Sequence, residues 1–369
     1  MSKDSQVTLS RPLLSIVIPT KDRYFYLKQL IELLLGYNSD ELEIVIQDNT
    51  YDNHKFIEYQ KQLDPNIVRY FHESKQLTIS ENSDRAILNS RGKYVCFLGD
   101  DDGTTPEIFN AVKWMENNNI DAAICSPVYY RWPDAYGVSG AELRLRKYSG
   151  LYQIKECKKV LKLCMKDGFT WRDGLPGVYH GIVSRRALDM IYRQAGTFFP
   201  GASPDIANCI AVCLTVEKYL EIDYPIIING AGKSHGGGDY RADISLRKLP
   251  FLPEDIIENW EDRIPKAWTA TTIWCESSVK ALKRMGRYDL LGQINYNYMY
   301  SVFISLYPRH RKLVSQITNY SPVLYLNLFK RYLKSGRRRL KKFLSPKHKV
   351  LRGINNIHEA VNIIMSLKR

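Results

Sequence analysis

Short apolar segments alternate with amphipathic stretches over the first 125 residues of the chain. Residues 13–19 (LLSIVIP) form a continuous β-branched run typical of buried parallel strands, and residues 42–47, 67–71, 93–98 and 121–125 have a similar character. Between the first two segments, apolar residues recur at helical spacing: Leu27, Leu30, Ile31, Leu34 and Leu35. This alternation predicts an α/β fold with a mainly parallel, Rossmann-like sheet flanked by helices.

Helix starts are indicated by residues with capping chemistry. A helix is expected to begin at Thr105-Pro106-Glu107, where Thr105 would cap it, and another at Ser203-Pro204-Asp205, where Ser203 would cap it. After about residue 126, aromatic and basic loop sequence (YYRWPDAYG) predicts mixed α+β structure, with an amphipathic helix at 154–165. Residues 249–287 have helical character, although Pro265 interrupts them. These patterns predict three consecutive regions, which are residues 1–125, 126–248 and 249–369.

Positive charge is concentrated near the C-terminus. The net charge is +14, and residues 309–352 contain fourteen Lys or Arg and no Asp or Glu, so the rest of the chain is nearly neutral. Apolar residues recur at helical spacing along the same segment: Leu326, Phe329, Leu333, Leu340 and Phe343. A basic amphipathic helix is typical of segments that bind an anionic membrane surface.

The cysteines and the absence of a long apolar segment bear on the compartment. The seven cysteines are scattered and include no C-x-x-C pair, which indicates reduced thiols. No signal-like apolar segment follows residues 1–11, and no run approaches the roughly 18 apolar residues of a spanning helix. The expected location is therefore the cytoplasm, with peripheral association at the inner face of the cell membrane.

Polar residues follow the predicted strands at the edge where an open parallel sheet binds ligands. Residues 20–23 (TKDR) follow the first strand, residues 48–50 (DNT) follow the second, and Asp100, Asp101 and Asp102 follow the fourth. Adjacent carboxylates repel one another, and a divalent metal, Mn²⁺ or Mg²⁺, would relieve this repulsion while substrate phosphates complete its ligand shell. An acidic turn is the plainer alternative.

Three of these sequences together carry a family resemblance. IVIPTKDR, IVIQDNT and GKYVCFLGDDD, in this order and at near-standard spacing, resemble the nucleotide-binding half of family 2 glycosyltransferases with the GT-A fold, as in bacterial surface-polysaccharide glycosyltransferases. The resemblance covers about residues 13–125. It implies that residues 1–125 bind the nucleotide sugar, that residues 126–248 bind the acceptor and carry the catalytic base, and that residues 249–369 form a helical appendage with a membrane-associating tail.

The resemblance also implies which residues bind the donor, a nucleoside diphosphate sugar expected to be UDP-linked. Pro19, Thr20 and Asp22 would line the uridine pocket, and Asp48 would accept a hydrogen bond from the base. Asp100 would face the ribose, and Asp102 would bind the metal. The other expected donor contacts are Arg23, Ser80, Asn82, Arg85 and Asp101. Helix capping is an equally good explanation of Thr20 and Asp22, and a plain turn is the alternative for Asp48.

The resemblance is weaker in the second half of the chain. Asp205 stands where family members carry an acidic base at the start of a helix, although Pro204 replaces the first residue of their usual Glu-Asp pair. The alternative is that Asp205 only complements the helix dipole. Residues 230–238 (GAGKSHGGG) imitate the end of a P-loop. A P-loop requires a glycine at position 227, where Ile227 stands, and a helix after Ser234, where glycines follow instead. We therefore interpret the segment as a lid in which His235 is a further metal ligand, or as a flexible connection with a solvated histidine.

These inferences predict an inverting, metal-dependent glycosyltransferase of cell-surface polysaccharide synthesis. A hydroxyl of a glycan or lipid-linked acceptor would attack the anomeric carbon, with Asp205 as the base. A sugar-phosphate nucleotidyltransferase is an alternative, but it requires a Gly-rich loop after the first strand, which PTKDR lacks. A nucleic-acid-binding protein is another, but no reader motif accompanies the basic tail. The sequence leaves open the sugar, the acceptor and whether the chain forms a homo-oligomer.

Overall fold

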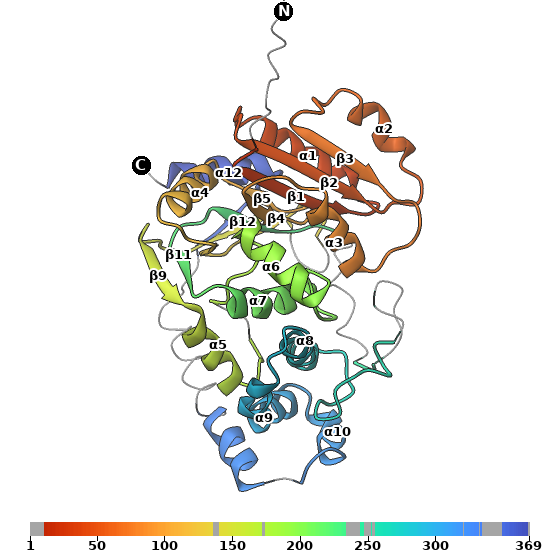
Figure 1. Ribbon diagram of the computed structural model, residues 1–369. Helices are drawn as coiled ribbons and strands as arrows, with labels where there is room; N and C mark the ends of the chain where they lie inside the picture. Colours follow the sequence, from red (N-terminus) through yellow and green to blue (C-terminus); the bar gives the residue numbers. More distant parts are fainter. Residues whose placement is uncertain are drawn as a thin grey trace, which may run out of the picture.

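A mainly parallel eight-stranded sheet forms the centre of the protein, as the sequence predicts (Figure 1). The structure, a computed structural model, describes residues 11–135, 140–171, 174–233, 244–246, 252, 255–319, 321–331, 333 and 349–367. The strands of this sheet are β1 (Leu14–Thr20), β2 (Leu42–Asp48), β3 (Val68–His72), β4 (Tyr94–Phe97), β6 (Ala122–Cys125), β9 (Tyr152–Glu156), β10 (Gly181–Ser184) and β11 (Lys218–Ile222). Their spatial order is β3-β2-β1-β4-β10-β6-β11-β9, and pairing is parallel from β3 to β4.

A second sheet has five short strands: β5 (Gly103–Thr104), β7 (Val128–Arg131), β8 (Glu142–Leu145), β12 (Ile227–Ala231) and β13 (Lys349–Arg352). Their spatial order is β13-β8-β7-β12-β5. Because β5 begins directly after the aspartates and pairs with β12, this sheet brings the end of β12 next to the carboxyl end of β4. The Gly-rich segment that follows β12 therefore starts beside the three aspartates.

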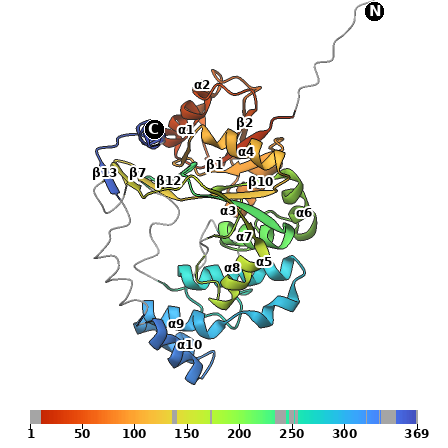
Figure 2. The ribbon, with the colours of Figure 1, turned by 90° about the vertical axis from the view of Figure 1, so that its left-hand side faces the viewer.

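Helices cover both faces of the central sheet and form a further layer below it (Figures 1 and 2). They are α1 (Tyr24–Leu35), α2 (His54–Gln60), α3 (Ile79–Leu88), α4 (Glu107–Asn117), α5 (Cys157–Lys166), α6 (Arg185–Ala195), α7 (Pro204–Thr215), α8 (Ala270–Arg284), α9 (Tyr296–Leu306), α10 (Lys312–Ser315) and α12 (Ile357–Ser366). Short 3₁₀ helices span Tyr288–Gln293 and Pro308–His310. The predicted fold class is confirmed, including the helical region after the α+β part.

The alternation of side chains along β1 separates two hydrophobic cores. Leu14, Ile16 and Ile18 belong to the core beneath α1, α4 and α12, whereas Val17 belongs to the core beneath α3, α6 and α7. Since successive side chains of a strand point to opposite faces, a continuous apolar run is what a strand covered on both sides requires. Every one of these four side chains is fully buried.

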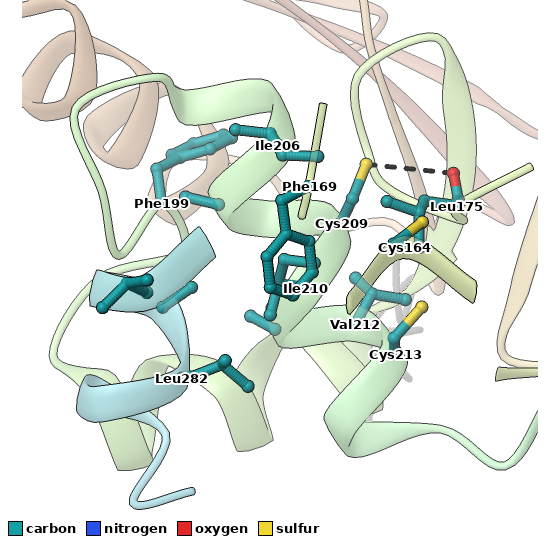
Figure 3. Close-up of a cluster of buried hydrophobic side chains, with 14 of the residues drawn as sticks. Cys164, Phe169, Leu175, Phe199, Ile206, Cys209, Ile210, Val212, Cys213 and Leu282 are labelled. Carbon is teal, nitrogen blue, oxygen red and sulfur yellow. Dashed lines mark hydrogen bonds between the residues drawn. The ribbon is translucent and has the colours of Figure 1, made fainter. Parts of the chain in front are cut away.

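Helix α7 lies at the centre of the second core. Figure 3 shows Ile206 near Phe199, Ile210 near Phe169 and Val212 near Cys164, so side chains on different sides of α7 are buried in this core. Cys164, Cys209 and Cys213 are buried in the same cluster and are free thiols, as the sequence indicates. Because α7 packs against α8, this core joins the sheet to the lower helical layer.

Three expectations about helix ends are wrong. Residues 152–156 form strand β9, paired with β11, so the helix expected at 154–165 begins only at Cys157. Within residues 249–287 the described helix is Ala270–Arg284, which starts after Pro265 at a capping box between Thr269 and Thr272. Thr105 does not cap α4 through its side chain, because its hydroxyl is buried without a hydrogen-bond partner in the described structure.

The end of the chain returns to the first domain, which the sequence did not predict. Strand β13 pairs with β8, and α12 packs against α1 and β5 (Figure 1). Ile357 is fully buried, and a Cβ at Gly103 would lie 2.6 Å from its side chain, so the chain after the aspartates and α12 fit closely together. Strand β13 and helix α12 therefore pack against elements that precede residue 146.

The first part of the basic tail is helical. Residues 322–331 form a helix whose Leu324 is fully buried, whereas Leu326, Phe329 and Leu333 are 47–59% exposed. Leu340 and Phe343 of the predicted stripe lie outside the described residues. Among the described residues, no helix has the length and apolar character needed to cross a membrane.

Candidate functional site

The carboxyl ends of β1 and β4 bring the first and last polar segments together. β1 is hydrogen-bonded to β4 on one side and to β2 on the other, so Thr20 lies opposite Asp48 and close to the aspartates. The Thr20 hydroxyl donates to Oδ2 of Asp100 over 2.7 Å. Parallel register thus places residues 80 positions apart in direct contact.

Arg23 supplies the positive charge that the aspartates need. Its Nε lies 3.1 Å from Oδ1 of Asp100, and a terminal nitrogen lies 2.6 Å from Oδ2 of Asp101. The side chain is only 16% exposed. Burial lowers the pKa of the guanidinium, but the two carboxylates more than offset this and raise the pKa overall. Asp22, immediately before, has a φ of 59° and an exposed side chain, and its backbone N–H donates to the Thr50 hydroxyl.

Burial raises the pKa of Asp100 to about 7, in spite of the nearby guanidinium of Arg23 and the hydrogen bond from Thr20. Asp101 and Asp102 raise it further by repulsion. The negative charge of the cluster therefore exceeds what Arg23 offsets. An added cation or a proton would stabilise this edge of the sheet.

Asp102 is surrounded by protein donors. Oδ2 accepts from the backbone N–H of Gly99 over 2.6 Å and from Nε2 of His180 over 2.7 Å, and Oδ1 accepts from the N–H of Gly230 over 2.8 Å. The residue is 1% exposed. Both carboxylate oxygens thus hold together three segments of the chain, namely the end of β4, the loop before β10 and the end of β12.

The aspartates also fix the start of the Gly-rich segment. The N–H of Gly232 donates to Oδ2 of Asp101 over 2.8 Å, and the N–H of Lys233 donates to the Tyr26 hydroxyl. A Cβ at Gly230 would lie 1.6 Å from the Asp101 carbonyl oxygen, so only glycine permits this approach. The segment therefore leaves β12 directly over the acidic cluster.

The groups around Asp101 fit a divalent cation better than those around Asp102. Carboxylate oxygens are the ligands that Mg²⁺ and Mn²⁺ prefer, and no described group donates to Oδ1 of Asp101. Each oxygen of Asp102 already accepts at least one hydrogen bond from the protein, and its expected role as a metal ligand stays a prediction. No three His, Cys, Asp or Glu side chains converge on a metal position within the described part of the chain. His235 lies outside the described residues.

Asp48 is held inside the protein. Its Oδ2 accepts from the hydroxyls of Tyr24 and Tyr70, each over 2.7 Å, and its Oδ1 accepts from the N–H of Thr50. The residue is fully buried. Asp48 therefore organises the turn after β2, and contact with a base would require one of these tyrosines to move. Pro19 is half-buried in β1, opposite Gln47.

The three expected contacts on α3 have different surroundings. Ser80 is half-buried at the start of the helix, next to the capping box of Thr78 and Glu81. Arg85 forms an exposed ion pair with Glu73, 2.6 Å long. The side-chain oxygen of Asn82 is buried and lacks a hydrogen-bond partner in the described structure. Of the three, Ser80 is the one that lines a cleft.

Asp205 lies in the first turn of α7, as expected from the Ser203-Pro204-Asp205 sequence. The Ser203 hydroxyl does not cap the helix; it donates to Oδ1 of Asp205 over 2.6 Å. The N–H of Ile206 donates to the same oxygen. These bonds hold the carboxylate at the helix start, where the helix dipole favours a negative charge.

His180 also belongs to this site. It lies in residues 175–186 (LPGVYHGIVSRR), for which the sequence left open a place in the acceptor site or a structural role. It has a φ of 57°, its ring stacks on Tyr179 at a centroid distance of 3.9 Å, and its Nδ1 is buried with no hydrogen-bond partner in the described structure. A left-handed backbone at a non-glycine residue is a strain that surrounding contacts must stabilise. The sequence signal was the YHG triplet before an apolar segment, but β10 is antiparallel to its neighbours, so the βαβ pattern did not predict its place.

Part of the chain matches a known protein family. Residues 15–166 match glycosyl transferase family 2, which confirms the resemblance seen in the three loop sequences. This segment contains Thr20, Arg23 and the three aspartates, and it ends before His180 and Asp205.

Individual relatives are distant. The chain is 29% identical over 93 residues to the GalNAc(5)-diNAcBac-PP-undecaprenol beta-1,3-glucosyltransferase of Campylobacter jejuni, and this match spans 25% of the chain and only 30% of that protein's length. The chain is also similar to residues 1–349 of S. aureus TarS in complex with UDP-GlcNAc, with a TM-score of 0.47 and 13% identity over 82% of this chain and 83% of the other. For the complex with UDP, the TM-score is 0.45 at 13% identity, over 81% and 72%.

Asp102→Ala is expected to lower the free energy of unfolding on the order of 3 kcal/mol or more, because each of three buried donors that loses its acceptor costs about 1–3 kcal/mol. Urea unfolding followed by circular dichroism measures this loss. Asp52→Ala is the control and should cost much less, since the Asp52 side chain is 62% exposed. Equal stability of the two variants would show that Asp102 is not a structural carboxylate.

Proposed function

We propose that this chain is an inverting glycosyltransferase that moves a sugar from a nucleoside diphosphate sugar, with UDP as the expected nucleotide, to a glycan or lipid-linked acceptor. The observation that carries the proposal is the contact of Thr20 and Arg23 with Asp100 and Asp101, at the carboxyl ends of two adjacent parallel strands. This edge is where open α/β sheets bind nucleotides. It lies inside the segment that matches glycosyl transferase family 2.

Arg23 has the chemistry to bind the diphosphate of the donor. A guanidinium binds phosphate oxygens through paired N–H groups, and Arg23 is held at the sheet edge by ion-pair contacts with two carboxylates. Its Nε and one terminal nitrogen are buried. They lie within ion-pair distance of the carboxylates, but neither N–H forms a well-aligned hydrogen bond with a described residue. We assign Arg23 to the diphosphate, Asp100 to the ribose and Asp101 to a divalent metal, which when bound would offset the charge of the departing diphosphate.

Asp205 is the proposed base. A hydroxyl that attacks an anomeric carbon must lose its proton, and a carboxylate positioned by Ser203 and by the helix start can accept it. The proton acceptor is thus contributed by the second half of the chain and the donor site by the first half. This division follows the two halves expected from the sequence.

The proposal also covers the kind of acceptor and the place in the cell where the protein acts. The Campylobacter relative is named for an acceptor linked to undecaprenol through a diphosphate. We propose an acceptor of this kind, in bacterial surface-glycan synthesis at the inner face of the membrane. The exposed apolar side chains of Leu326, Phe329 and Leu333 and the adjacent Lys330 would bring the protein to that surface.

Asp101→Asn is expected to weaken binding of a UDP-sugar at least tenfold in the presence of Mn²⁺, because the metal loses a charged ligand. Calorimetry with UDP-GlcNAc, UDP-glucose and UDP-galactose, each with Mn²⁺ or with EDTA, measures the effect. Asp52→Asn changes an exposed carboxylate outside the acidic cluster and should leave binding unaltered. Absence of binding by the unmodified protein to every nucleotide sugar offered would overturn the proposed function.

Asp205→Asn is expected to reduce turnover about a hundredfold, the usual worth of a positioned proton acceptor, while the dissociation constant of the donor stays within twofold. Single-turnover transfer to an acceptor measures the loss. Asp189→Asn on α6, with a half-exposed carboxylate, is the control. Near-normal turnover of the Asp205 variant would transfer the role of base to another residue.

Replacement of Leu326, Phe329 and Leu333 by serine is expected to lower binding to phosphatidylglycerol vesicles at least tenfold, because these side chains no longer enter the bilayer surface. Vesicle sedimentation measures binding, and phosphatidylcholine vesicles test the charge dependence. Serine at Leu88 and Met190, which are exposed on α3 and α6, is the control. Substitution is preferable to truncation after Ser321, which would also remove β13 and α12. Undiminished sedimentation of the triple variant would place the membrane contact elsewhere.

A further inference from the structure

A cleft of about 840 Å³ opens between the central sheet domain and the lower helices, and none of the three aspartates lines it. One wall is the start of α3, with Leu77 and Ser80; another is the loop of residues 197–202; a third carries Leu252 and Ile256; and the C-terminal half of α8 completes the lining. The volume lies within the range of small-molecule sites. None of the roles assigned above uses this space, apart from Ser80 at its edge.

The walls of the cleft have two kinds of surface. Leu77, Phe199, Pro200, Leu252 and Ile256 give it an apolar side. Lys280, Lys283 and Arg284 of α8 give it a basic side. A ligand that fits both must combine hydrocarbon with negative charge.

The acidic residues of the lining are committed to contacts within the protein. The Glu81 carboxylate accepts from the N–H and the hydroxyl of Thr78 in the capping box, and Asp255 accepts from the side-chain amide of Asn259. Asp84 accepts from the Thr197 hydroxyl over 2.6 Å and from the N–H of Phe198 over 2.8 Å, and burial raises its pKa. These carboxylates therefore face local donors within the protein.

The basic residues differ in how they are paired. Lys280 lies 2.8 Å from the buried carboxylate of Glu276, and Lys283 lies 2.6 Å from Glu261. Arg284 is exposed, and its only described polar interaction is a longer-range attraction to the half-buried Asp84. The two lysines are held in place by their partners, and the guanidinium of Arg284 can turn its paired N–H groups to an anion.

The cleft also has a defined place relative to the proposed site. Its loop wall, residues 197–202, runs directly into Ser203 and the start of α7, where Asp205 lies. The hydroxyl of Ser277 on α8 accepts the N–H of Ser203 over 2.8 Å and so ties this loop to the basic helix. A ligand in the cleft would therefore lie against the segment that positions the proposed base.

We propose that this cleft binds the acceptor, and that the acceptor carries a phosphate or diphosphate attached to a hydrocarbon chain. Arg284 binds the phosphate, and the apolar wall contacts the chain. The identification of this ligand as the acceptor, rather than as another amphiphilic anion, rests on the proposed function. Binding of such a ligand to the cleft can be measured whether or not the protein transfers a sugar.

The test is binding of farnesyl diphosphate to the full chain, measured by calorimetry without any nucleotide sugar. Arg284→Gln should weaken binding at least tenfold, because the phosphate loses its guanidinium. Arg287→Gln is the matched control, since Arg287 lies three residues further on, is paired with Asp289 and does not line the cleft. Both arginines are exposed enough for substitution to leave the fold intact, and thermal unfolding checks this. Farnesol and inorganic pyrophosphate test the two parts of the ligand separately.

The expected result is tight binding of farnesyl diphosphate, weak binding of farnesol and of pyrophosphate, and no displacement by UDP. Equal effects of the two arginine substitutions, or no binding of farnesyl diphosphate at all, would overturn the proposal. Displacement by UDP would assign the cleft to the donor diphosphate and overturn it as well. Failure of the proposed function is a separate outcome, seen as the absence of any nucleotide-sugar binding in a protein that still binds farnesyl diphosphate through Arg284.

Discussion

The negative charge buried after β4 is the constraint on which the rest of the site depends. Three consecutive carboxylates at the end of a strand cannot all stay ionised and buried unless other groups stabilise them. Arg23, Thr20 and His180 come from other parts of the chain to do this, and backbone N–H groups from the end of β12 complete the set. The acidic cluster therefore holds together the loops that surround it, as well as serving the proposed binding of the donor.

The different roles of the aspartates follow from their partners. Asp102 accepts three hydrogen bonds from the protein, Asp101 keeps one oxygen without a described donor, and Asp100 faces Thr20 and Arg23. A new partner for Asp102 competes with hydrogen bonds that hold three segments together, whereas Asp101 has an oxygen that can bind a partner without breaking a described hydrogen bond. Identical side chains in sequence thus acquire different chemistry from the backbone groups around them.

The second half of the protein adds a surface of a different kind. Helix α7 carries Asp205 at its start and packs along its length against α8, whose other end lines the cleft with basic residues. The same packing that buries the core around Ile206 and Ile210 therefore sets the distance between the proposed base and the proposed phosphate-binding residues. Hydrophobic packing, which has no chemical role, determines here where the chemistry can take place.

The sequence by itself determined the parallel sheet, because β1 and β4 carry apolar residues on both faces and such runs are stable only between two layers of helices. It also determined that residues 20–23 and the aspartates would meet, since the carboxyl ends of parallel strands share one edge. Only the tertiary structure decided what contacts Asp102, because His180 and Gly230 are 78 and 128 residues away and reach it through an antiparallel strand and a second sheet that no local pattern indicates. The packing of α12 against α1 could not be predicted for the same reason. An amphipathic sequence indicates that one face of a helix is buried, but long-range packing decides which element covers that face.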